Sequence, residues 1–275
     1  MFVDTHCHLN FKAFDADWRS AAERAFDVNV KGIVNVGSNY STSVRAVELA
    51  RQYRDGKLDN GKLFAAVGLH PIHVSALAKT PSRDRGDEDF RIDEYKKLAQ
   101  DPSVVAIGET GLDLFHTPDS VERQKEVFQQ LLFLAGQIDK PVIIHNRQAG
   151  KEVIEVLASA KKPARGVMHF FSEDWAYAQK LFELGFYISF TAAVTLNNVS
   201  ASTVEVIKKA PLGRIMIETD APYVVPRLQK NKGIKRNEPT FVTEVAKRIA
   251  EIRGIDTAEV ARLTTQSAID LFGLT

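Results

Sequence analysis

Short apolar runs rich in branched residues alternate along the chain with longer segments whose apolar residues recur every three or four positions. The first pattern is typical of buried strands and the second of amphipathic helices. Eight runs are expected to be strands, at residues 1–8, 32–36, 63–69, 104–109, 141–145, 166–169, 186–190 and 214–220. Helices are expected between them, at residues 14–28, 41–53 (with Ser41 as N-cap), 89–100, 120–139, 150–160, 174–184 and 200–210.

This alternation predicts an α/β fold in which each strand reaches the next through a helix. Such crossovers produce a parallel sheet, and eight of them close it into a (β/α)8 TIM-type barrel. Two further helical patterns follow, at residues 240–253 and 257–272, as the eighth barrel helix and an extra C-terminal helix that covers the barrel. We expect a single domain over residues 1–275, because barrels of about 250 residues fold as one unit.

Composition and charge narrow the classes of function. A net charge of +1 argues against a protein that coats nucleic acid or membrane with its whole surface, so any contact with a polyanion must be local. The single cysteine excludes a disulfide framework, and the first residues lack the pattern of a secretory signal. No apolar run approaches the roughly 20 residues that span a bilayer. We therefore expect a soluble cytoplasmic protein, with no membrane contact and no obligatory protein partner.

The first strand carries two histidines separated by one residue. Because alternate side chains of a strand share a face, His6 and His8 point the same way and can bind one metal ion together. Cys7 then points to the opposite face, where a buried apolar role is expected. A strand that merely carries two surface histidines is the alternative.

Ionisable residues also gather at the carboxyl ends of the expected strands. In a barrel these ends meet at one mouth, where the active sites of this fold lie. Four imidazoles and two carboxylates suffice for two divalent ions that share one carboxylate. Core histidines with only structural hydrogen bonds would not cluster in this way. The expected metal ligands are His6, His8, Glu109, His145, His169 and Asp220.

Chemical roles follow for the acidic residues. Asp220 is the candidate general base, since a carboxylate beside a metal can accept the proton of an activated water. Glu109 is the candidate shared ligand. Glu218 has the strand parity of Asp220 and faces inward, either as a ligand or as the support of one. Asp4 also faces inward, to orient a ligand or to form an ion pair, whereas His116 lies on a loop and is given no role.

Substrate contacts are expected around the same mouth. Arg147 lies two residues beyond His145, where its guanidinium can hold a phosphate through two hydrogen bonds. His70 ends the third strand, and it either contacts substrate or belongs to a structural turn. Residues 227–236 hold five basic residues and no acid. This segment is interpreted either as a solvated loop or as a loop that contacts phosphate. The candidate phosphate contacts in this run are Lys230, Lys232 and Lys235.

Six short motifs together resemble the TatD-type metal-dependent DNases of the amidohydrolase superfamily. They are DTHCHL (4–9), GLHP (68–71), GETGLD (108–113), KPVIIHNR (140–147), HFFS (169–172) and ETDAP (218–222), with NEP (237–239) after them. The resemblance implies a TIM-type barrel that hydrolyses phosphodiesters with divalent metal and attacks single-stranded DNA from its 3′ end. It also implies one ion held by His6, His8, Glu109 and Asp220, and a second held by Glu109, His145 and His169.

Two other functions compete with a nuclease that acts on DNA or RNA. An amidohydrolase acting on a small cyclic amide, lactone or ester would use the same kind of metal site, but that group commonly has a carbamylated lysine where Glu109 stands. A scaffold without catalysis would not need all six ligand positions. No nucleophile elbow, phosphate-binding loop or dinucleotide glycine pattern is present. The metal is left open between magnesium, zinc and manganese.

Overall fold

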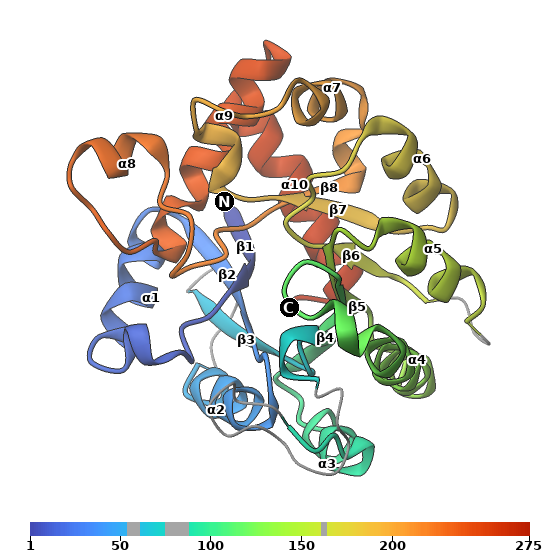
Figure 1. The fold of residues 1–275 in the computed structure, drawn as a ribbon. Helices are drawn as coiled ribbons and strands as arrows, with labels where there is room; N and C mark the ends of the chain where they lie inside the picture. Colours follow the sequence, from blue (N-terminus) through green and yellow to red (C-terminus); the bar gives the residue numbers. More distant parts are fainter. Residues whose placement is uncertain (54–60, 75–87, 161–163) are drawn as a thin grey trace.

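The structure is a computed structural model that describes residues 1–53, 61–74, 88–160 and 164–275. Eight parallel strands form one sheet in the order of the sequence, and helices surround it (Figure 1). This confirms the expected (β/α)8 TIM-type barrel. The strands are β1 (Phe2–Cys7), β2 (Val30–Val36), β3 (Lys62–Val67), β4 (Val104–Asp113), β5 (Val142–Arg147), β6 (Gly166–Met168), β7 (Tyr187–Phe190) and β8 (Ile215–Ile217).

The helices between strands lie close to their expected positions. They are α1 (Trp18–Asp27), α2 (Tyr40–Arg51), α3 (Ile92–Leu98), α4 (Val121–Gln137), α5 (Gly150–Ala158), α6 (Trp175–Glu183) and α7 (Ala201–Lys209). Asn39, not Ser41, is the N-cap of α2: its side chain accepts from the Thr42 amide, and its own amide donates to the Thr42 hydroxyl. After β8 come α8 (Arg227–Asn231), α9 (Val242–Arg253) and α10 (Thr257–Phe272). Short 3-10 turns connect these elements, among them η1 (Lys12–Phe14), η3 (Pro71–His73) and η6 (Leu212–Arg214).

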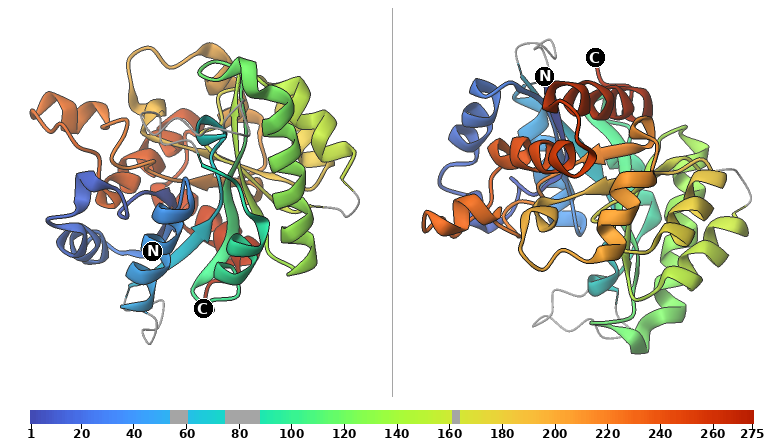
Figure 2. Two further views of the ribbon diagram at one scale, coloured as in Figure 1. Left: turned by 60° about the horizontal axis from the view of Figure 1, so that its bottom comes forward. Right: turned by 90° about the horizontal axis from the view of Figure 1, so that it is seen from above.

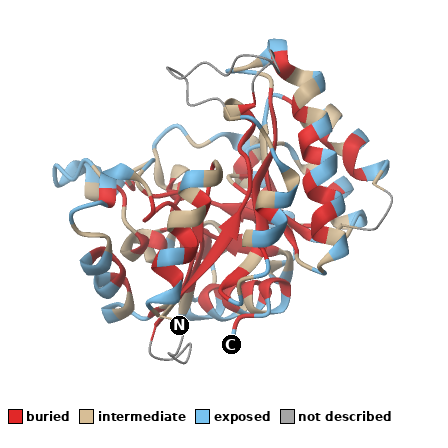
Figure 3. Ribbon diagram, turned by 90° about the horizontal axis from the view of Figure 1, so that it is seen from below, coloured by how far each residue is buried: buried red, intermediate tan, exposed pale blue. Residues whose placement is uncertain are grey.

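Two apolar layers account for the barrel's packing. The larger layer lies between the sheet and the surrounding helices, and it includes Cys7, which is fully buried as expected. The smaller layer fills the barrel interior with residues such as Val34, Phe64 and Met216, and it continues into Leu271 of α10. Figure 3 shows the strands buried and the outer faces of the helices exposed. The extra C-terminal helix therefore covers one end of the barrel, as expected.

Two views confirm which end α10 covers. It lies beside the chain's N-terminus (Figure 2), where the Thr265 hydroxyl donates to the Met1 carbonyl at 3.1 Å. This is the amino-terminal end of the strands, so the carboxyl-terminal mouth stays open. Among the described residues, no helix is long and apolar enough to cross a bilayer.

Polar groups join the first strand to the last. The buried Asp4 carboxylate accepts hydrogen bonds from the Thr219 amide at 2.9 Å and the Thr219 hydroxyl at 2.6 Å. Next to it, the Asp220 amide donates to the His6 carbonyl at 2.8 Å and the His8 amide donates to the Ala221 carbonyl at 2.8 Å. The barrel thus closes through hydrogen bonds at its mouth. Asp4 supports this seam and also accepts from the amide of the expected ligand His6 at 3.3 Å, which agrees with the expected orienting role.

Register shifts redirect two of the strands. In β1 the pairing shifts between Asp4 and Cys7, and in β4 it shifts between Ile107 and Thr110. Such irregularities turn side chains to the other face of a sheet and are common beside active sites. They explain why His6 and Glu109 point into the mouth although simple alternation from the interior residues Val3 and Ala106 would turn them outward.

The strand ends differ from the expected ones. Glu109 lies in the middle of β4, because the strand continues to Asp113 and pairs with β5 as far as Arg147. Asp220 lies three residues beyond the end of β8. The expected ligands therefore reach the mouth from within strands as well as from the loops that follow them.

Candidate metal centre

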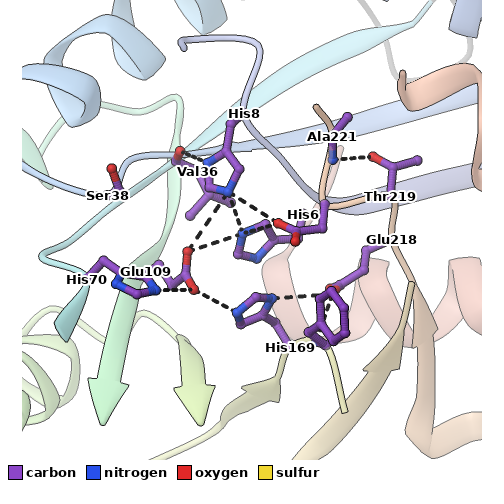
Figure 4. A network of polar contacts seen from close by, with 12 residues as sticks. His6, His8, Val36, Ser38, His70, Glu109, His169, Glu218, Thr219 and Ala221 are labelled. Carbon is purple, nitrogen blue, oxygen red and sulfur yellow. Dashed lines mark hydrogen bonds and ion pairs between the residues drawn. The ribbon is translucent and has the colours of Figure 1, made fainter. Parts of the chain in front are cut away.

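The six expected ligands converge at the barrel mouth, and Figure 4 shows His6, His8, Glu109 and His169 among them. Glu109 lies among them, only 3% exposed, and its two carboxylate oxygens face different groups of histidines. The ligands of this cluster come from several strands of the barrel and from the loops that follow them. His6 belongs to β1 with His8 directly after it, Glu109 to β4, His145 to β5, His169 follows β6, and Asp220 follows β8.

The first set of ligand atoms surrounds Glu109 Oε2. This oxygen lies 3.4 Å from His6 Nε2 and 4.0 Å from His8 Nε2. Asp220 Oδ1 lies 3.7 Å and 3.4 Å from the same two nitrogens, which are 3.2 Å apart. Tetrahedral ligands about 2.0–2.1 Å from one ion are roughly 3.3 Å from each other. His6, His8 and Glu109 thus lie close enough to hold one divalent ion, and Asp220 lies beside both histidines.

The second set surrounds Glu109 Oε1 and is more compact. This oxygen lies 2.7 Å from His169 Nε2 and 2.9 Å from His145 Nδ1, and the two nitrogens are 3.3 Å apart. Burial opposes the charge of His169, but Glu109 raises the pKa of His169 well above its usual value. A proton held there must leave before a metal binds, so metal affinity of this set will fall as the pH falls.

The outer ring nitrogens of the histidines bear on how each ring is held for metal binding. A neutral histidine that binds a metal through one nitrogen carries its proton on the other, which then needs an acceptor. In three histidines the outer nitrogen lies near an oxygen acceptor, whereas Nδ1 of the fourth expected ligand, His6, is buried without a hydrogen-bond partner among the described residues. The pairs are His8 Nδ1 with the Val36 carbonyl at 2.8 Å, His145 Nε2 with Asp113 Oδ2 at 3.4 Å, and His169 Nδ1 with Glu218 Oε1 at 3.4 Å.

His70 has the opposite arrangement. Its Nε2 lies 3.3 Å from Glu109 Oε1 and 3.1 Å from His145 Nδ1, so it belongs to the mouth cluster. Its Nδ1, however, accepts a hydrogen bond from the Ile72 amide. Burial and the neighbouring His145 lower the pKa of His70 to about 4, so the ring is neutral at pH 7 and its one proton is on Nε2. His70 thus presents a hydrogen-bond donor to the mouth, which suits a substrate contact and not a metal ligand.

Both carboxylates of the first set are ionised in this environment. Burial would raise the pKa of Glu109, but the charges and hydrogen bonds of the surrounding histidines hold it well below the usual value. Burial likewise opposes the charge of Asp220, and the contact with His8 outweighs it, so the pKa of Asp220 is also lowered. Each is therefore available as an anionic ligand, and Asp220 as a proton acceptor, at neutral pH.

Glu218 lies beside His6 and His169, a group that could hold a metal ion, but its carboxylate oxygens already accept hydrogen bonds. It is fully buried, and one of its oxygens accepts from the Phe170 amide at 2.8 Å. The other accepts from the Ser189 hydroxyl, so both oxygens are occupied. The sequence left two roles open for Glu218, as a ligand or as the support of one. These contacts, together with the nearby His169, favour the supporting role.

Sequence reasoning missed Asp113. Its buried carboxylate lies behind His145 and is also 2.7 Å from Nδ1 of His116, the histidine that was given no role. Burial opposes ionisation, but the contact with His145 and the amide and ring of His116 lower the pKa of Asp113. The available signal was a second acidic residue in the same strand as Glu109, three residues before a histidine. Asp113 thus lies behind His145 at 3.4 Å, as Glu218 lies behind His169 at the same distance.

The expected substrate contacts lie on the rim. Arg147 is exposed, and its guanidinium lies over the Phe115 ring at 4.9 Å. The basic run is partly helical, since it begins with α8, and the lysines expected to contact phosphate, Lys230, Lys232 and Lys235, are all exposed. Their contact with substrate stays a prediction, as does metal ligation by the six mouth residues.

A barrel whose carboxyl-terminal mouth brings histidines and carboxylates together belongs to the class of barrels built to hold divalent metal. Comparison with known proteins agrees: the family described as TatD related DNase matches residues 3–273. The chain therefore belongs to the TatD family, and it is a metal-dependent hydrolase. The resemblance inferred from sequence is confirmed.

Three relatives show how far the similarity extends. The uncharacterized metal-dependent hydrolase YabD of Bacillus subtilis is 36% identical over 273 residues, which are 99% of either chain. The uncharacterized metal-dependent hydrolase YcfH of Escherichia coli is 31% identical, over 98% of this chain and 95% of its own. The crystal structure of YjjV, a TatD homolog from E. coli, superposes with a TM-score of 0.83 at 28% identity, over 100% of this chain and 98% of the other.

Replacement of Glu109 by alanine should reduce bound metal more than replacement of His145 or His169. A shared ligand serves both sets, so its loss should empty both, whereas either histidine serves only the second. Metal analysis of the purified variants measures this directly. His70→Ala is the matched control and should keep both ions. Two ions still bound to Glu109→Ala would contradict the shared role.

Asp113→Asn should weaken metal binding in the second set. The amide can still accept the Phe115 and His116 backbone hydrogen bonds at Oδ1. It cannot supply the negative charge behind His145, and loss of such a partner typically costs about 10- to 100-fold in metal affinity. Titration with a metal-binding dye measures the change. Asp119→Asn, at an exposed site on the same segment, is the control, and equal affinities in all three proteins would refute the role of Asp113.

Proposed function

We propose that the protein is a divalent-metal-dependent phosphodiesterase that removes nucleotides from the 3′ end of single-stranded DNA. The observation that carries this proposal is the buried Glu109 carboxylate, whose two oxygens face two separate sets of ligand atoms. Two ions held by one shared carboxylate suit in-line displacement at phosphorus. In this proposal His6, His8, Glu109 and Asp220 hold the first ion, and Glu109, His145 and His169 hold the second.

The ions, whether magnesium, zinc or manganese, would lower the pKa of an attacking water and neutralise charge on the phosphoryl oxygens. The chain's own residues supply the rest. Asp220 is ionised and lies at the mouth, so it accepts the proton of the attacking water. His70 donates its Nε2 proton to a substrate oxygen, and the exposed Arg147 binds a flanking phosphate.

Uncompensated positive charge on the rim supports a polyanionic substrate. In the described part of the chain, no carboxylate lies within 4.0 Å of the Lys230, Lys232 or Lys235 ammonium groups. Arg236 at the end of this run is different, because its guanidinium holds both oxygens of Asp17, at 2.8 and 2.7 Å. It anchors the segment beside α1 (Figure 1), and the three lysines stay free to meet phosphates.

The competing function is hydrolysis of a small cyclic amide, lactone or ester at the same centre. Free cations on the rim serve no purpose for such neutral substrates, which favours the nuclease. Product analysis on end-labelled single strands of DNA and RNA, with magnesium, manganese and zinc in turn, tests the proposal. Stepwise shortening from the 3′ end supports it; turnover of lactones or cyclic amides without cleavage of either nucleic acid would refute it.

Asp220→Asn should keep the fold and lower kcat by about 100-fold or more, because an amide cannot accept a proton and general-base catalysis contributes about 10²–10⁴. Rates on an end-labelled strand measure the loss. Metal content must be determined in the same sample, since Asp220 also belongs to the first set. Near wild-type turnover would exclude Asp220 as the base.

Alanine at Lys230, Lys232 and Lys235 together should weaken oligonucleotide binding and flatten its dependence on salt. Each lost phosphate contact removes about 0.7 from the slope of log K against log salt for single strands, so three contacts remove about 2. Hydrolysis of a small phosphodiester that cannot reach these lysines should be unchanged.

The matched control replaces Lys96, Lys97 and Lys208, which are exposed near the carboxyl ends of α3 and α7, away from the mouth. It carries the same change in net charge, so it isolates position from charge. Binding lost equally in both triple variants would show a general charge effect, and no loss in either would mean a solvated segment.

A further inference from the structure

A large aromatic ring lies half exposed at the mouth, on the loop after β4. Phe115 is 52% exposed, although the burial of such rings usually contributes strongly to stability. The Arg147 guanidinium lies over its face at 4.9 Å from the ring centre. The His116 ring meets it edge-on, with centres 4.7 Å apart and planes at 89°. An aromatic ring, a planar cation and an imidazole are thus grouped on one exposed surface.

This group has a fixed position relative to the second set of ligand atoms. The Leu114 amide donates to the Arg147 carbonyl at 2.9 Å, so the loop after β4 is joined to the last residue of β5. Arg147 follows His145 by two residues on the same strand, so both side chains share a face and their backbones are about 7 Å apart. Phe115 and Arg147 therefore lie about one strand pleat beyond the metal centre, toward solvent.

The loop that carries the ring is held in place by Asp113. One carboxylate oxygen of Asp113 accepts from the Phe115 amide at 2.9 Å and from the His116 amide at 2.7 Å. Within the described ranges, no carboxylate lies within ion-pair distance of Arg147. The pair of Phe115 and Arg147 is consequently ordered before any ligand arrives, and its cation is not neutralised.

We propose that Phe115 and Arg147 form a stacking site for one nucleobase of a single strand whose neighbouring phosphate lies at the metal centre. The inference rests on the proposed function and adds to it how the strand is held. Bases stack on aromatic rings and guanidinium planes whatever their identity, so this contact grips a strand without reading its sequence. The guanidinium edge stays able to bind the adjoining phosphate.

Phe115 is the clean probe of this proposal. Another exposed ring at the mouth, Tyr223, packs edge-on against His8 and Phe11, so its removal would also disturb the first set of ligand atoms. The Phe115 ring contacts His116 and Arg147, and neither is a proposed metal ligand. Phe133 is similarly exposed, at 48%, but lies near the carboxyl end of α4. It therefore offers a control of the same residue type away from the mouth.

The experiment compares wild type with Phe115→Leu, Phe115→Trp and Phe133→Leu on end-labelled single-stranded DNA. Each strand carries a normal base or an abasic residue, placed in turn at each of the last few 3′ positions. Phe115→Leu should raise KM by about 5- to 150-fold, the range that one stacked base contributes. kcat and metal content should change little, Phe115→Trp should restore KM, and Phe133→Leu should match wild type.

The abasic strands identify the contact itself. At one position, removal of the base should raise the KM of wild type as much as Phe115→Leu does, and the two changes together should cost no more than either alone. The stacking site would be overturned if the KM effects of Phe115→Leu and of base removal multiplied at every position. An unchanged KM in Phe115→Leu would also overturn it. If the wild-type protein cleaves no single strand at all, the proposed function itself fails. This outcome is distinct from failure of the stacking site, because it appears in the wild type before any variant is compared.

Discussion

The mouth of the barrel depends on the burial of one carboxylate. An ionised group taken out of water costs several kcal/mol unless it is paired, and Glu109 meets this requirement with histidines at both oxygens. Those histidines need acceptors for their outer nitrogens in turn, which is why Asp113 and Glu218 are buried behind them. A single buried charge therefore dictates the polar groups of two surrounding layers.

Much of this arrangement could be predicted from the sequence. The apolar pattern indicated eight strand–helix units, and the strand-end positions of His145 and His169 predicted that both lie at the mouth, where they meet Glu109. Alternation alone fails in β1 and β4, because register shifts there reverse the direction of the side chains. Such shifts follow from pairing with neighbouring strands, which a local pattern does not contain.

Long-range polar contacts were the other part beyond sequence reasoning. The basic run after β8 was visible as a local excess of charge, but the pairing of Arg236 with Asp17 joins positions 219 residues apart. His116 was dismissed because it lies on a loop, yet the loop folds back onto Asp113. The partner of a side chain decides whether a cation is free or anchored. It also decides whether a histidine supports the site or is incidental to it.

The seam between β1 and β8 has a consequence for the order in which the protein matures. The hydrogen bonds that close it join residues 212 and 215 positions apart, and contacts of such separation form slowly because a long loop must close first. The His6 and His8 pair is synthesised first, whereas Asp220 reaches it only when the last strand has docked. Until then the chain holds three of the four groups of the first set, His6, His8 and Glu109, and no closed barrel mouth. Completion of the first set is therefore a late event that depends on a closed barrel, whereas the residues of the second set all precede β8.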